Sequence, residues 1–209
     1  MICKRVGVDE DLKALKEATE EELWSLHDKL AAEFRRVWQR IREGSLSLKE
    51  LETPRTSFLR VKIELAERLL KSCRFCVRRC GVNRAKGQVG FCGLGREARV
   101  STWFHHFGEE GPLLGGGGHP VGGSGTIFFT SCNLRCVFCQ NYDISFHPRN
   151  GIIVDACKLA AIEAELRREG AANINFVGGE PTPNLHVILA SMEHLNLNVP
   201  MLWNSNMLC

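Results

Sequence analysis

The chain has 209 residues, of which 44% are hydrophobic and 24% are charged, and these ordinary globular values exclude a wholly disordered or collagen-like protein. No apolar run approaches the length of a membrane span, and the acidic start MICKRVGVDEDLKALKEATEEE lacks the apolar core of a secretory signal. We therefore expect a cytoplasmic protein with no membrane partner. In a reducing cytosol, ten cysteines favour metal ligands or catalytic thiols over five disulfides.

The net charge of +3 is unevenly distributed along the chain. Residues 73–100 carry seven basic side chains against the single acidic residue Glu97, whereas residues 101–209 carry more acidic than basic side chains. The positive charge is therefore concentrated in one segment, and that segment also contains four cysteines.

Two helices are predicted in the first third of the chain, over residues 9–43 and about 56–72. In the first helix, apolar side chains recur at three- and four-residue steps, at Leu23, Leu26, Leu30, Phe34, Val37 and Ile41. Such a stripe is typical of core packing or of a partner helix. We assign residues 1–57 to a helical N-terminal extension.

Residues 58–125 form a second predicted region, with the second helix followed by a Cys-rich and a Gly-rich segment. Residues 108–125 contain nine of the twenty glycines, including Gly115 to Gly118. This stretch can be a flexible linker or a loop that brings backbone close to a ligand, and composition leaves both interpretations open.

From residue 126 the sequence alternates between short apolar strands and amphipathic helices. The strands are TIFFT (126–130), NINFV (173–177) and VPMLWN (199–204), and the helices cover residues 155–168 and 184–195. This alternation predicts βαβ units, a parallel sheet and an α/β fold over residues 126–209.

The motif richest in chemistry is the CxxxCxxC of Cys132, Cys136 and Cys139, which directly follows the first of these strands. Three thiolates on one loop can hold three corners of a metal cluster and leave the fourth metal position open. The position also favours a site, because parallel α/β folds bind ligands at the carboxyl ends of their strands.

The sequence resembles radical S-adenosylmethionine (SAM) enzymes at two places. CxxxCxxC with an aromatic residue before the last cysteine, here Phe138, is the family's signature, and Gly178-Gly179-Glu180-Pro181 matches a second element one βαβ unit later. The longer strings GSGTIFFTSCNLRCVFCQNYDIS and NINFVGGEPTPNLHVIL resemble PflX-like proteins, which are related to pyruvate formate-lyase activating enzymes. The resemblance covers roughly residues 58–209.

The resemblance implies a [4Fe–4S] cluster on Cys132, Cys136 and Cys139, with SAM bound at its open iron. The SAM-binding residues implied are Phe138 near the adenine and Gly178, Gly179, Glu180 and Pro181 near the methionine ammonium. The implied reaction is reductive cleavage of SAM to a 5′-deoxyadenosyl radical that abstracts hydrogen, as in glycyl-radical enzyme activation. The resemblance also implies an electron donor of the flavodoxin or ferredoxin type, and a substrate that can be a protein.

Family barrels have about six strands, whereas this chain supplies three, so the resemblance implies a partial (β/α) barrel that is incomplete at its C-terminal side. Asn204-Ser205-Asn206 resembles the family's strand end that faces the site. The alternative function is a non-catalytic iron–sulfur or zinc-binding module for electron transfer or partner binding.

A second cysteine set comprises Cys73, Cys76, Cys80 and Cys92, with basic side chains and glycines between its members. Three interpretations stay open, namely an auxiliary iron–sulfur cluster, a structural zinc ion, and reduced cysteines without metal. Val77 stands where related sequences lead us to expect proline. The basic excess suits an acidic protein donor, and the scarcity of aromatic residues disfavours nucleic acid.

The remaining candidates carry weaker signals. Cys3, Cys157 and Cys209 are isolated and are assigned structural roles. His105-His106, with Glu109 and Glu110 nearby, can supply metal ligands or acid–base groups, although a satisfied surface or core pair is the simpler interpretation.

Overall fold

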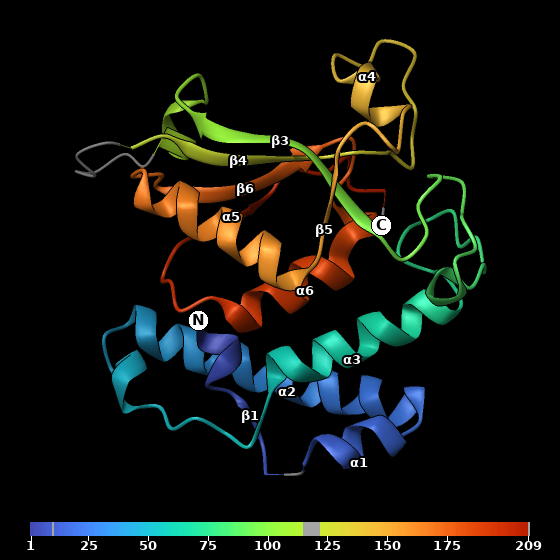
Figure 1. The fold of residues 1–209 in the computed structure, drawn as a ribbon. Coiled ribbons are helices and arrows are strands. Elements are labelled where there is room, and N and C mark those ends of the chain that lie inside the picture. Colours follow the sequence, from blue (N-terminus) through green and yellow to red (C-terminus); the bar gives the residue numbers. More distant parts are fainter. Residues whose placement is uncertain (10, 115–121, 209) are drawn as a thin grey trace. The chain divides into compact units, whose positions relative to one another are not determined.

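The computed structural model describes residues 1–9, 11–114 and 122–208, so the glycine run at 115–118 and Cys209 lie outside the described residues. The chain divides into two compact units, Met1–Arg68 and Leu69–Cys209 (Figure 1). Within the described residues, no helix combines the length and the apolar character that crossing a membrane requires.

The first unit is mainly helical. It contains β1 (Gly7–Val8), α1 (Leu12–Glu17), α2 (Glu20–Arg42), β2 (Thr56–Ser57) and most of α3 (Phe58–Lys71), and β1 pairs antiparallel with β2. The helix predicted over residues 9–43 is broken into α1 and α2. The break occurs because Ala18 is extended and Thr19 starts a new helix, where the Thr19 hydroxyl and the Glu22 carboxylate form a capping box.

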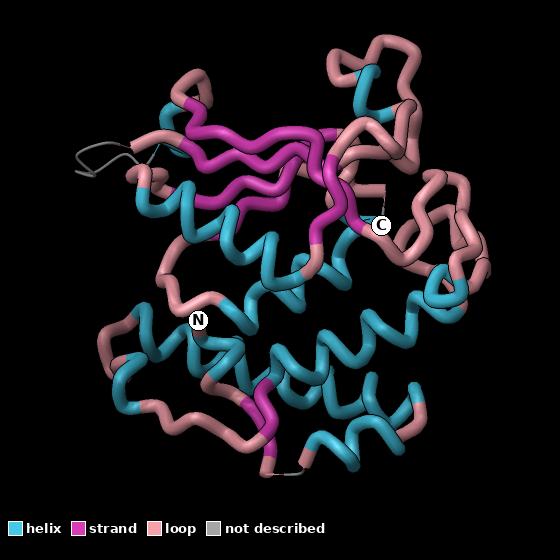
Figure 2. Tube along the Cα trace, in the orientation of Figure 1, coloured by secondary structure: helices cyan, strands magenta, loops and turns pink. Residues whose placement is uncertain are grey.

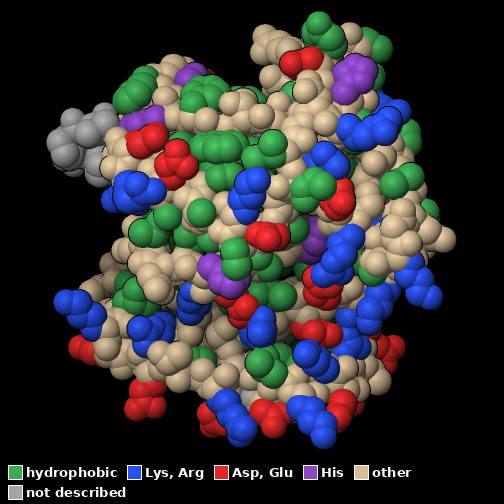
Figure 3. All heavy atoms as spheres, in the orientation of Figure 1, with side chains coloured by type: hydrophobic (Ala, Val, Ile, Leu, Met, Phe, Trp, Pro, Cys, Tyr) green, Lys and Arg blue, Asp and Glu red, His purple; other side chains and the backbone are tan. Residues whose placement is uncertain are grey.

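The core of the first unit confirms the predicted apolar stripe except at Ile41, which is not among the residues of the cluster. Leu23 and Leu30 of α2 are fully buried, and Leu26, Phe34 and Val37 pack partly buried against the same cluster. The α3 side chains Phe58, Val61 and Leu65 complete the cluster together with Val6 and Leu15. Figure 3 shows acidic and basic side chains interspersed on the surface of the molecule.

The second unit is built on a five-stranded mixed sheet with the order β5-β3-β4-β6-β7. Its strands are β3 (Ala98–His106), β4 (Ser124–Phe129), β5 (Ile152–Val154), β6 (Asn173–Gly178) and β7 (Met201–Trp203). The three predicted strands are confirmed as β4, β6 and β7, and they run parallel. The sheet also contains β3 and β5, which were not predicted and which run antiparallel to their neighbours. The α/β class is thus confirmed, whereas the partial barrel stays a prediction.

Helices α5 (Ala156–Arg168) and α6 (Leu185–His194) pack together on one face of the sheet, as the ribbon shows (Figure 1). The helices predicted over residues 155–168 and 184–195 are therefore confirmed. Their apolar faces meet the alternate sheet residues that point toward them, including Ile127, Phe129, Ile174 and Phe176. This core supports the ends of β4 and β6, and a functional site at these ends needs such a rigid support.

The Cys-rich segment that follows α3 is almost entirely loop, apart from a single 3₁₀ turn at Arg84–Lys86 (Figure 2). A short helix, α4 (Tyr142–Ser145), follows the CxxxCxxC loop. The chemistry-bearing cysteines therefore lie on irregular backbone, and hydrogen bonds rather than regular elements must position them.

Two glycines let the end of β6 approach the end of β4 very closely. Gly178 pairs with Phe129 and has a φ of +108°, and a Cβ on Gly178 would lie 2.4 Å from the Phe129 carbonyl oxygen. A Cβ on Gly179 would lie 1.9 Å from the Ser131 carbonyl oxygen, which is far inside van der Waals contact. Glycine is thus required here by backbone packing within the chain itself.

We expect Gly179→Ala to lower the free energy of unfolding by about 1–3 kcal/mol, since the new methyl group must push rigid backbone aside. Urea denaturation followed by circular dichroism measures this change. Gly111→Ala is the matched control, because no atom of the described residues lies within 4 Å of a Cβ there, and it should change the free energy by less than about 0.5 kcal/mol. Equal effects at both positions would contradict the packing argument.

Between α5 and α6 lies a buried carboxyl group that the fold keeps protonated. Burial raises the pKa of Glu163 to about 8. The Ser191 hydroxyl lies 2.8 Å from both the Ile188 carbonyl oxygen and Glu163 Oε1. One hydroxyl has one proton, so a protonated Glu163 can donate to Ser191 while Ser191 donates to Ile188.

This carboxyl makes the stability of the fold depend on pH. Because the pKa in the folded state is raised above 4.5, its ordinary value, the stabilisation is complete below pH 4.5 and is lost as pH rises toward 8. Between pH 5 and pH 8, we expect the free energy of unfolding of the unmodified chain to fall by roughly 4 kcal/mol more than that of Glu163→Gln, because the amide cannot ionise. Urea denaturation at both pH values tests this, and parallel pH profiles for the two chains would contradict it.

Candidate functional site

The CxxxCxxC loop begins where β4 ends, and hydrogen bonds fix its two sides. The Ser131 amide donates to the Ile144 carbonyl at 2.8 Å, and the Thr130 hydroxyl donates to the Pro148 carbonyl at 2.8 Å. Ser131 and Arg135 adopt left-handed backbone, with φ of 75° and 60°. Non-glycine residues adopt this conformation only where the surroundings enforce it, as they often do at functional loops.

The structure places the three predicted ligands on this one loop. Cys132 is buried, while Cys136 and Cys139 are partly exposed, and all three are free thiols. The Leu134 amide donates to Cys132 Sγ at 3.3 Å, and Cys139 Sγ lies 3.5 Å from the Ser145 hydroxyl. Phe138, predicted near an adenine, is 84% exposed at the tip of the loop.

The turn predicted to bind the methionine end of SAM follows β6 directly. The Glu180 side chain is buried there, and the chain's own groups already bond both of its oxygens. Oε1 accepts from the Thr182 amide at 3.0 Å, the Thr182 hydroxyl at 2.5 Å and the Ser205 hydroxyl at 2.8 Å. Oε2 accepts from the Asn206 amide at 2.9 Å. The Glu180 carboxylate therefore ties the segment after β7 to the turn after β6.

The same segment also reaches the cysteine loop. Asn206 Nδ2 donates to Asn133 Oδ1 at 2.8 Å and lies 3.7 Å from Cys132 Sγ. Asn133 Nδ2 in turn donates to the Leu208 carbonyl at 3.1 Å. The three strand ends of β4, β6 and β7 are thus joined by one polar network, in which Asn206 is the central residue.

These residues fit an iron–sulfur cluster by their chemistry. Three free thiols on one loop are the donor type that holds such clusters, and they lie at the carboxyl ends of parallel strands. Among residues 1–9, 11–114 and 122–208, however, no three Cys, His, Asp or Glu side chains are already arranged to hold a metal ion. Binding therefore requires the thiols of this irregular loop to converge.

The second cysteine set lies against the first loop. Cys73, Cys76, Cys80 and Cys92 all line one small pocket, which Asn133 and Pro183 also line. The Ser131 hydroxyl donates to the Cys92 carbonyl, and Arg78 Nε donates to the Asn133 carbonyl at 3.0 Å. Burial raises the pKa of the Cys92 thiol, Arg84 lowers it, and the nearby Cys73 and Cys76 raise it further.

A buried arginine that sequence reasoning did not single out completes this pocket. Arg84 is fully buried, with Nε donating to the Gly95 carbonyl at 2.8 Å and Nη1 to the Pro183 carbonyl at 2.9 Å. Nη1 also lies 3.9 Å from Cys73 Sγ, while Nη2 has no hydrogen-bond partner among the described residues. The signal in the sequence was the basic excess of residues 73–100, which does not tell which arginine is buried.

The histidine candidates lie at the other end of the sheet. His105 pairs with Gly125 near the start of β4, and its Nε2 lies 2.6 Å from the Gly122 carbonyl oxygen. His106 Nδ1 lies 3.1 Å from Glu109 Oε1, which also accepts from Asn175 Nδ2 at 3.3 Å. The histidines are therefore partnered and are separated from the cysteine loop by the length of β4.

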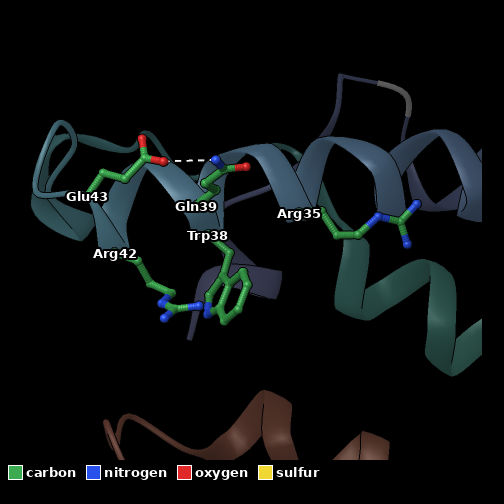
Figure 4. A pocket seen from close by; sticks show the side chains of 5 residues that line it. All are labelled: Arg35, Trp38, Gln39, Arg42 and Glu43. Carbon is green, nitrogen blue, oxygen red and sulfur yellow. Dashed lines mark hydrogen bonds between the residues drawn. The ribbon is translucent and has the colours of Figure 1, made fainter.

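A surface hollow in the first unit is lined by side chains of α2, namely Arg35, Trp38, Gln39, Arg42 and Glu43 (Figure 4). The Arg42 guanidinium lies 4.8 Å from the centre of the Trp38 ring, and Gln39 donates to Glu43 at 2.8 Å. None of these side chains is a thiol or an imidazole. The cysteine-bearing end of the sheet is thus the better candidate for chemistry.

Comparison with known proteins agrees with this placement. The family model described as "Radical SAM superfamily" matches residues 126–208, which run from β4 to the segment after β7. The chain is also 39% identical over 191 residues to an uncharacterized protein, MJ0674, of Methanocaldococcus jannaschii. That alignment covers 89% of this chain and 52% of the relative, so the chain spans about half the relative's length. No solved structure matches.

The matched residues contain the three-thiol loop, the glycine turn and the polar network that joins them. Residues 126–208, which form most of the second unit, are therefore similar to radical SAM domains.

Proposed function

We propose that this chain is an enzyme that binds a [4Fe–4S] cluster through Cys132, Cys136 and Cys139 and cleaves SAM reductively beside it. One observation carries the proposal. The three-thiol loop and the Gly178–Pro181 turn follow adjacent parallel strands whose last residues, Phe129 and Gly178, are paired. Ligands of parallel α/β folds bind at this edge of the sheet.

When bound, the cluster supplies one electron to the sulfonium of SAM, which yields methionine and a 5′-deoxyadenosyl radical that takes a hydrogen atom from the substrate. The chain's own residues bind and orient the reactants. Backbone carbonyls of the Gly178–Pro181 turn are acceptors for the methionine ammonium. The Glu180 carboxylate acts as a positioning group, because it holds Ser205 and Asn206 against that turn. Phe138, exposed at the loop tip, supplies an apolar surface for the adenine.

The electron must come from a reduced partner protein, and we propose an acidic donor of the flavodoxin or ferredoxin type in a reducing cytoplasm. The supporting feature is a basic cluster beside the cysteine loop. The guanidinium groups of Arg78 and Arg135 lie 4.0 and 4.9 Å from the centre of the Phe91 ring. Arg135 belongs to the loop itself, so a donor that docks on these charges comes close to the cysteines.

The substrate is proposed only by resemblance. PflX-like proteins are related to activating enzymes that take hydrogen from a protein glycine, and a protein substrate is therefore the first to test. The alternative is a non-catalytic iron–sulfur or zinc module, and the experiment below separates the two functions.

We expect the anaerobically reconstituted chain to show an electron paramagnetic resonance spectrum that changes when SAM is added, and to form 5′-deoxyadenosine under reduction. Cys136→Ala should abolish this product, because the cluster loses a ligand. Cys157→Ala is the matched control, since this exposed thiol of α5 lies outside both cysteine sets, and its product yield should be unchanged. A cluster whose spectrum does not change with SAM, or zinc in place of iron at this loop, would contradict the enzyme proposal and support the alternative.

Glu180→Gln tests the positioning role. The amide keeps the shape of the carboxylate but can accept at only one of its two polar atoms, so bonds to Ser205 or Asn206 must be lost. We expect the free energy of unfolding to fall by about 1–3 kcal/mol even without SAM, as urea denaturation measures. The control Glu169→Gln changes an exposed carboxylate and should have no effect. A normal stability of Glu180→Gln would show that the carboxylate is free for the ligand.

A further inference from the structure

The pocket of the second cysteine set gathers four thiols from a loop segment of only twenty residues. Cys73 and Cys80 are brought together by backbone pairing, because the Cys73 amide donates to Val82 at 2.9 Å and the Gly81 amide donates to Cys73 at 3.0 Å. The Phe91 amide donates to Cys80 Sγ at 3.4 Å, which places the Gly90–Cys92 turn beside that thiol. Amide hydrogen bonds to cysteine sulfur are a common feature of iron–sulfur centres.

Arg84 gives a second and independent sign of a ligand. It is fully buried against this pocket, its Nη1 lies 3.9 Å from Cys73 Sγ, and its Nη2 lacks a partner among the described residues. None of the described residues that line the pocket is acidic. A buried cation without a counter-charge is strongly destabilising, and a bound anion in this pocket would stabilise Arg84.

A metal centre held by four thiolates supplies such an anion. Four thiolates around a divalent ion have a formal net charge of −2, and a four-iron cluster with four cysteine ligands is also anionic. We propose that Cys73, Cys76, Cys80 and Cys92 together bind one such metal centre and that Arg84 balances its charge. Zn²⁺ and an iron–sulfur cluster share this tetrathiolate chemistry, and the metal content distinguishes them.

Metal binding must draw the thiols together, because they are not yet arranged around a common point. Cys73 and Cys92 are buried, whereas Cys76 and Cys80 are partly exposed. The four proposed ligands are distinct from the cysteines of the Cys132–Cys139 loop, so the two centres can be tested separately.

The experiment uses the full chain with Cys132, Cys136 and Cys139 all replaced by alanine, so that metal on the first loop cannot contribute. After anaerobic purification, elemental mass spectrometry should find about one zinc or about four irons per chain, the latter with a thiolate-to-iron absorption band. Adding Cys80→Ser and Cys92→Ser should lower the metal content at least tenfold, whereas adding Cys157→Ala should leave it unchanged. Absence of metal from the parent chain, or metal that survives Cys80→Ser and Cys92→Ser, would overturn the proposal.

A second measurement needs no substitution and so does not depend on the folding of a variant. The unmodified chain is stripped of metal, reloaded with Zn²⁺ or with iron and sulfide, and treated with iodoacetamide, and peptide mass spectrometry then locates the label. Metal should protect Cys76 and Cys80 at least fivefold, while the exposed Cys157 should react equally with and without metal. Equal labelling of Cys76 and Cys80 in both states would overturn the proposal.

The role of Arg84 has its own readout in competition with a chelator. Arg84→Met should weaken metal binding at least tenfold relative to Arg84→Lys, because lysine keeps the positive charge. Equal affinities for these two variants would contradict charge balance by Arg84, whatever their stabilities.

Discussion

The candidate site depends on one buried carboxylate. Glu180 accepts four hydrogen bonds from three positions, and through Asn206 this network extends to Asn133 beside Cys132. Bonds to a charged acceptor are stronger than neutral ones, and inside the protein an unmade bond would leave a charge unpaired. The ends of β4, β6 and β7 are therefore fixed relative to one another by electrostatics, because the strands themselves stop before the site.

The regular elements of the second unit follow from local sequence patterns. TIFFT, NINFV and VPMLWN predict β4, β6 and β7, because short apolar runs between helical segments are typical of a parallel sheet. The strand β3 was not predicted, because it lies between a Cys-rich segment and a Gly-rich stretch and shows little alternation of apolar and polar residues. Only Ala98 and Val100 of this strand are fully buried. The first unit shows the same limit, since the stripe on α2 was evident but the break at Ala18 depends on a capping box that the periodicity does not register.

The residue types of the candidate site can be read from the sequence, whereas the contacts among them cannot. The spacing of Cys132, Cys136 and Cys139 indicated a metal loop, and the glycine turn was found by its place one βαβ unit later. The resemblance implied that Gly178 and Gly179 lie near the methionine ammonium, and the structure shows that their missing side chains leave room for the backbone of Phe129 and Ser131. The hydrogen bond from Ser205 to Glu180 joins residues that are 25 positions apart, and the bond from Arg84 to Pro183 joins residues that are 99 positions apart. No local sequence pattern encodes such contacts.

Those long separations bear on the order in which the site assembles. The cysteine loop is held on one side by the Ser131 bond to Cys92, which spans 39 residues, and on the other by the Asn206 bond to Asn133, which spans 73. Contacts between distant residues carry the entropy cost of closing the intervening chain and tend to form late in folding. During synthesis the three thiols of the loop thus emerge from the ribosome well before Asn206 can reach them. Iron and sulfide that arrive early would meet an open loop, and the segment after β7 would then close over the proposed cluster.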